Sequence, residues 1–76
     1  MNTARKAYVV RDADSDIPSG DVTQVYAYTL KGLTTALDDA RLRSFGGIPQ
    51  EVVVMTDGEA TVIRRFDHGH EVPATP

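Results

Sequence analysis

Two runs of β-branched and aromatic residues in the N-terminal part of the chain predict β-strands. The first spans residues 7–11. The second spans residues 22–29, where Val22, Tyr26 and Tyr28 share one face and Val25 and Ala27 share the other. The stretch between them, residues 12–21, is polar and contains a Pro-Ser-Gly sequence typical of a loop. The two strands are therefore expected to form an antiparallel hairpin with a long loop.

An amphipathic helix is predicted for residues 34–45. Thr35 precedes Asp38 by three positions, which is a weak capping-box pattern, and Thr34 would serve nearly as well as the N-terminal cap. Gly46-Gly47 after the last turn suits a left-handed cap. At 100° per residue, the apolar stripe lies within about 60° of one line. Its members are Leu33, Ala36, Leu37, Ala40 and Ser44.

The clearest pattern is a β-hairpin near the C-terminus. Residues 52–56 and 61–66 are rich in valine, isoleucine and threonine, and Asp57-Gly58 between them is a pair favoured in type I′ turns. A four-residue turn over 57–60 would change the register that a two-residue turn sets. The two-residue turn places Val53 opposite Val62, Val52 opposite Ile63 and Glu51 opposite Arg64.

These elements predict an α+β fold of the ββαββ type. We expect a four-stranded, mainly antiparallel sheet with one helix packed on one face. The single domain is assigned to residues 7–66, with flexible tails over residues 1–6 and 67–76, where no periodic pattern is found.

The terminal hairpin is expected to be apolar on both faces, whereas the helix can cover only one. An antiparallel sheet with one solvent-exposed face usually alternates apolar and polar residues along its strands, and the polar residues of that pattern are largely missing here. A second copy of the chain, packed sheet on sheet or extending the sheet at an edge, would cover the other face. Leu42 lies about 180° from the buried stripe and favours the same hypothesis, unless it is an ordinary exposed leucine. A homo-oligomer, first of all a dimer, is therefore expected. The two faces carry Val53, Met55 and Val62 on one side and Val52, Val54 and Ile63 on the other.

Composition narrows the classes of function. The chain has no cysteine, which removes disulfides, thiolate metal sites and thiol nucleophiles. Its net charge of -3 opposes the phosphate attraction on which most nucleic-acid binders rely, so a nucleic-acid partner is disfavoured. No signal peptide and no membrane-spanning run is found, which indicates a cytoplasmic protein. Arginine outnumbers lysine and valine outnumbers isoleucine, which favours a bacterial or phage source.

An acidic patch is the candidate surface for a protein partner. Asp12, Asp14 and Asp16 have the spacing of the first three ligands of a calcium loop. The match then fails, because Ile17 stands at the sixth place, where the loop requires glycine for a sharp turn, and Thr23 stands at the twelfth, where it requires a bidentate glutamate. A solvated acidic loop is therefore preferred over a calcium site. The same carboxylates could attract a basic protein if they converge with those on the helix. The predicted interaction residues are Asp12, Asp14, Asp16, Asp21, Asp38, Asp39 and Leu42.

Two further sets of residues define alternative sites. Aromatic rings on a sheet can stack bases while arginines hold phosphate, although rings packed in the core are the more common arrangement. The residues of this alternative site are Tyr8, Tyr26, Tyr28, Arg11 and Arg65. His68 and His70 are weak candidates for a metal site, and a histidine-containing tail is the simpler interpretation. No cofactor is expected.

The leading hypothesis is a small non-enzymatic interaction or regulatory domain. It self-associates through its sheet and binds another protein, as an accessory or inhibitor protein of bacteria or phage would. The alternative is a module that binds a nucleotide or single-stranded nucleic acid through the tyrosine face. A small metal-dependent enzyme is the least supported class, because no nucleophile or base stands beside an orienting partner in the sequence and no catalytic residue is assigned.

Overall fold

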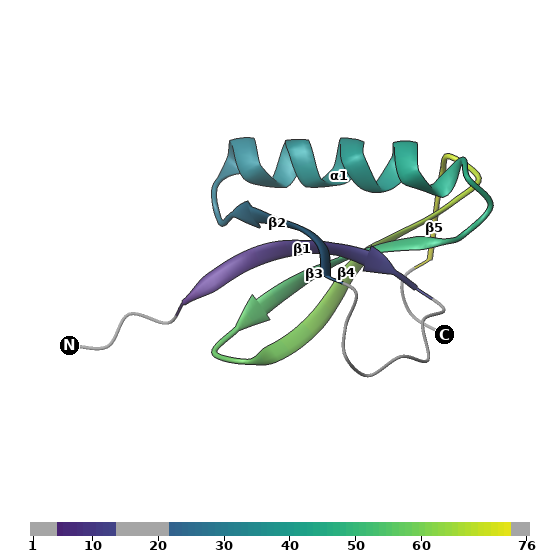
Figure 1. Ribbon diagram of the computed structural model, residues 1–76. Coiled ribbons are helices and arrows are strands. Elements are labelled where there is room, and N and C mark those ends of the chain that lie inside the picture. Colours follow the sequence, from purple (N-terminus) through teal and green to yellow (C-terminus); the bar gives the residue numbers. More distant parts are fainter. Residues whose placement is uncertain (1–4, 14–21, 74–76) are drawn as a thin grey trace.

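In the part of the chain that the structure describes, a single helix covers one face of a five-stranded antiparallel sheet (Figure 1). The computed structural model describes residues 5–13 and 22–73. The strands lie side by side in the order β2-β1-β3-β4-β5, and α1 packs across β1, β2, β3 and β4. The elements are β1 (Lys6–Asp12), β2 (Val22–Ala27), α1 (Leu30–Ser44), β3 (Gln50–Thr56), β4 (Glu59–Asp67) and β5 (His70–Val72).

The α+β class with one helix on an antiparallel sheet is confirmed, but the predicted count of four strands was wrong. The fifth strand, β5, lies within residues 67–76, for which the sequence predicts a flexible tail. It follows a tight turn in which His68 and Gly69 both have positive φ, 51° and 82°. Histidine adopts this left-handed conformation more readily than most residues. Glycine is favoured at position 69 by this φ, and a side chain there would also displace the exposed ring of Phe45.

The helix begins one turn earlier than the sequence indicated. Thr29 is the N-terminal cap, and its hydroxyl oxygen accepts a hydrogen bond from the backbone N–H of Gly32 at 3.0 Å. The hydroxyls of Thr34 and Thr35, the two caps that the sequence predicts, instead donate to carbonyls one turn back, at 3.0 and 2.9 Å. The predicted end was nearly correct, because α1 ends at Ser44 and Gly47 has the left-handed φ of 95°.

The β3–β4 hairpin turns at Asp57-Gly58 as predicted, with positive φ at both positions. The register is correct next to the turn and wrong beyond it, because a β-bulge leaves Ile63 without a partner in β3. Every later residue of β4 is therefore displaced by one position. The observed pairs are Val53 with Val62, Val52 with Arg64 and Glu51 with Arg65.

The core lies between the helix and the sheet. Two alanines of α1, Ala36 and Ala40, are fully buried and allow the helix backbone to approach the strands closely. Bulky residues of β1, β3 and β4 fill the space beneath them. The buried cluster comprises Tyr8, Val10, Ala36, Ala40, Val52 and Phe66, with Tyr26, Leu33, Leu37, Val54 and Ile63 packed against it.

The sheet face opposite the helix exposes less apolar surface than the sequence implied. Val9 and Val53 alternate with core residues of β1 and β3 and therefore lie on this face. They are nevertheless only 6% and 0% exposed. Each has neighbours on the same face along its own strand and on both adjoining strands. The centre of this face is thus already shielded within one chain, and its exposed apolar surface lies toward the edges.

Candidate functional site

The tyrosines of the alternative binding site lie on the helix side of the sheet. The ring of Tyr8 is buried in the core and stacks on Tyr28 with 4.9 Å between ring centroids. Lys6 places its ammonium 5.2 Å from the centroid of the Tyr28 ring. The pKa of Tyr8 is raised, first by burial and then by the neighbouring Tyr28 hydroxyl. Of these two rings only Tyr28 remains exposed, and its face is already occupied by a cation.

Tyr26 belongs to a hydrogen-bonded network that joins the sheet to the helix. Its hydroxyl donates to Oδ2 of Asp39 at 2.7 Å, while Nε of Arg43 donates to Oδ1 of the same carboxylate at 2.8 Å. Burial is the main cause of the raised pKa of Tyr26, and Asp39 adds to it, whereas Arg43 acts in the opposite direction. Both oxygens of Asp39, a predicted interaction residue, therefore serve internal contacts.

The arginines of the alternative site lie on the opposite face from Tyr8. Nε of Arg11 lies 2.6 Å from Oε1 of Glu51, and Glu51 pairs in register with Arg65 on its other side. The three side chains form a charged row across β1, β3 and β4. The structure therefore does not bring the tyrosines and the arginines of that prediction together.

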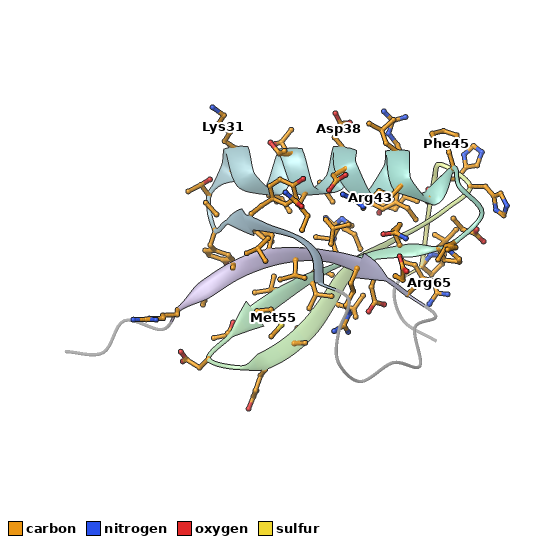
Figure 2. The ribbon with its side chains drawn as sticks, viewed as in Figure 1. Lys31, Asp38, Arg43, Phe45, Met55 and Arg65 are labelled. Carbon is orange, nitrogen blue, oxygen red and sulfur yellow. The ribbon has the colours of Figure 1, made fainter. Side chains whose placement is uncertain are left out.

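The predicted acidic patch is only partly described. Asp14, Asp16 and Asp21 lie outside the described residues. Asp12, at the end of β1, accepts a hydrogen bond from Nε2 of Gln50 at 2.6 Å. Asp38 points away from the sheet on the outer side of α1, as Figure 2 shows.

The remaining predicted residues lie at the far end of the helix and beside it. Leu42 is 59% exposed on α1. His68 forms part of the β4–β5 turn, with Nδ1 2.7 Å from Oδ1 of Asp67, and His70 pairs with the same aspartate in the ladder. Within residues 5–13 and 22–73, no three histidine, aspartate or glutamate side chains are grouped so as to hold a metal ion.

An open hollow of about 300 Å³ lies where β1 begins beside the β3–β4 turn. Its lining combines the apolar Ala7 and Met55 with charged residues, of which Asp57 accepts a hydrogen bond from the Arg5 N–H at 3.2 Å. This lining contains no serine, threonine, cysteine or histidine. The residues around the hollow are Arg5, Lys6, Ala7, Met55, Asp57 and Gly58.

The most distinctive surface is the free edge of β2, whose outward backbone groups can be identified. In antiparallel ladders, residues of one strand bond alternately to its two neighbours. Two backbone hydrogen bonds just beyond the ends of β1 show which of its residues bond to β3. The Ala13 N–H donates to the Pro49 C=O, and the Arg5 C=O accepts from the Asp57 N–H. Because Arg5 and Ala13 are both odd-numbered, the odd-numbered residues of β1 bond to β3. Even-numbered residues therefore bond to β2, through the pairs Tyr8 with Tyr26 and Val10 with Gln24. The N–H and C=O of Val25 point away from the sheet.

Exposure and composition single out the same edge. Val25 is 57% exposed on the helix-free face, and no described strand pairs with the outer side of β2. The strand VTQVYA contains no charged residue and no proline, the usual means of protecting an edge from association. At the other edge, β5 has three residues, carries Glu71 and is followed by Pro73. Sequence reasoning missed the β2 edge because the order of strands was unknown, although the uncharged run was visible.

No family model, curated protein or solved structure gives a significant match to this chain. None of the helices in the described part of the chain has both the length and the apolar character needed to cross a membrane.

Proposed function

We propose that this protein is a small non-enzymatic interaction domain that self-associates through its sheet. The observation that carries the proposal is the free edge of β2, where an exposed valine and outward backbone groups occur on an uncharged strand. A strand of this kind is a template for another strand. Pairing would satisfy the backbone groups of Val25 and bury its side chain at the same time.

A role in binding other proteins follows from the same surfaces. A self-associated domain would still present the outer face of α1, where Asp38 and Leu42 are exposed. Regulation or inhibition of a protein partner by such a surface needs no catalytic group. Within the described residues, the polar side chains that are most buried are engaged in structural contacts, as Ser44 and Glu51 illustrate.

The nucleotide-binding alternative has weaker support. It needs aromatic faces open to a base, and Tyr8 and Tyr26 are packed against the helix. Tyr28 is the ring to test, because Tyr26→Ala would also break the hydrogen bond to Asp39 and disturb the fold. Loss of nucleotide binding in Tyr28→Ala, with the fold and oligomeric state unchanged, would favour this alternative.

Sedimentation velocity of the purified chain from low to high micromolar concentration tests the proposal. A folded dimer or higher oligomer that dissociates on dilution is the expected result. A well-folded monomer throughout the range would refute self-association. Affinity capture with the tagged protein from its native cell then tests the second half of the proposal, since a reproducible protein partner is expected.

A further inference from the structure

We propose that two copies of the chain pair through β2 in an antiparallel arrangement, with Val25 on the two-fold axis. This joins the two sheets into one continuous sheet with a helix on each half. The inference rests on the proposed self-association and specifies its surface, its symmetry and its register.

The backbone selects Val25 as the centre of the pairing. Its N–H and C=O both point outward, so two Val25 residues can exchange two hydrogen bonds across the axis. Registers centred closer to the end of β2 are less favourable, because the C=O of Ala27 already accepts from the N–H of Thr29 at 2.9 Å. Toward the start of β2, the ladder is interrupted opposite Arg11, where the register shifts. Val25 is therefore the outward residue at the centre of the regular part of the strand.

The side chains agree with this register. Val25 pairs with Val9, Val9 with Val53 and Val53 with Val62, so four valines form one row across the helix-free face. Val25 is the exposed end of that row. A two-fold axis at this position places the two Val25 side chains in contact and continues the row into the second copy. On the helix side, Gln24 lies opposite Tyr26 of the other copy, and no charged side chain of β2 enters the interface.

A second copy is a better occupant of this edge than a stacked sheet or a charged foreign strand. Sheet-on-sheet packing would gain little at the centre of the face, because Val9 and Val53 are already buried in one chain. A strand of another protein could not be selected by charge complementarity, because β2 carries no charged residue. Identical strands, in contrast, match each other in hydrogen bonding and in side-chain character. The chain is acidic overall, so an uncharged edge is also where two copies approach with least repulsion.

The first test replaces Val25 by proline. Because the Val25 N–H does not bond to β1, proline removes an intermolecular donor without removing a bond of the monomer's own ladder. The dissociation constant of the dimer, measured by sedimentation, is expected to rise at least about tenfold. The circular dichroism spectrum is expected to stay native. A folded Val25→Pro variant that dimerises like the wild type would overturn the β2 pairing while leaving self-association intact.

Cysteine cross-linking gives an independent test, which holds even if the proline variant fails to fold. The chain has no native cysteine, so Val25→Cys introduces a single thiol on the proposed axis. Directly bonded residues of antiparallel strands lie about 5.5 Å apart at Cα, within the range of a disulfide. Rapid cross-linking by an oxidant or a short bifunctional thiol reagent is expected at low micromolar concentration. Slow cross-linking of this variant in a sample that sediments as a dimer would overturn the inference.

Two control variants separate the proposed register from other modes of association. Leu42→Cys places a thiol at almost the same exposure as Val25, 59% against 57%, but on the helix. Gln24→Cys places one on the same strand but opposite position 26 of the second copy. Both are expected to cross-link far more slowly than Val25→Cys, and faster reaction at either position would overturn the two-fold at Val25. A wild-type chain that is monomeric at all concentrations would refute the proposed function itself.

Discussion

Ser44 links the end of the helix to the turn before β5, and its replacement by alanine tests how that strand is held. Its side chain is completely buried, and Oγ accepts a hydrogen bond from the Gly69 N–H at 2.7 Å while donating to the Arg41 C=O at 2.7 Å. In Ser44→Ala the partly buried Gly69 N–H loses its acceptor, which costs about 1–3 kcal/mol. Alanine's better helix propensity returns roughly 0.5 kcal/mol.

The expected net loss in the free energy of unfolding is about 0.5–2.5 kcal/mol. Urea unfolding followed by circular dichroism measures this loss. An unchanged m-value would indicate that the folded and unfolded states keep their compactness. Thr34→Ala is the matched control, because it removes a hydroxyl that bonds to a helix carbonyl at an exposed site, and it should change stability by less than about 0.5 kcal/mol.

Hydrogen exchange at the Gly69 amide distinguishes a local from a global effect. Protection at Gly69 is expected to fall more in Ser44→Ala than protection at the centre of β3. If Ser44→Ala were no less stable than Thr34→Ala and protection at Gly69 were unchanged, the proposed role of Ser44 would be incorrect.

Three further predictions concern the helix–sheet contacts. Tyr26→Phe removes the hydroxyl that donates to Asp39 and should lower the free energy of unfolding by about 1.5 kcal/mol in urea titrations. The raised pKa values of Tyr8 and Tyr26 mean that the folded state favours protonated phenols, so stability should be complete below about pH 10 and decline as pH rises through the folded-state pKa values. Urea midpoints measured against pH check this, and a flat alkaline profile would contradict it. Gly32→Ala should destabilise the fold by about 1–3 kcal/mol despite alanine's helix propensity, because its Cβ would collide with the Ala27 carbonyl oxygen; a gain in melting temperature would show that the collision is relieved without cost.

Local sequence patterns predicted a turn correctly where one pair of residues decides its backbone geometry. Asp57-Gly58 indicated a two-residue turn, and both residues have the positive φ that such a turn needs. His68-Gly69 forms a turn of the same kind but was overlooked, because histidine is a less common first residue and only a short strand follows. The helix start was misplaced because three threonines compete for the capping position, and packing against Ala27 favours Thr29.

The candidate site was harder to predict from the sequence than the secondary structure, because the role of each residue in it depends on neighbours that are distant in the chain. Val25 appeared as one apolar residue of an alternating strand, with no sign that β2 would lie at the edge of the sheet. The tyrosines and arginines appeared to form one set, and the strand alternation places Tyr8 and Arg11 on opposite faces. The bulge at Ile63 also changed the partner of Glu51 from Arg64 to Arg65.

The sequence by itself determined the class of fold, the single helix, the tight turn at Asp57-Gly58 and the absence of cysteine chemistry, because these depend on residue type and on spacing within a few positions. Only the tertiary structure decided the order of strands, and with it which backbone groups are paired and which remain free. Strand order is set by how the helix and the valine-rich strands pack together as a whole. That packing placed β3 beside β1, left Val25 at an unpaired edge, and shielded Val9 and Val53 within one chain.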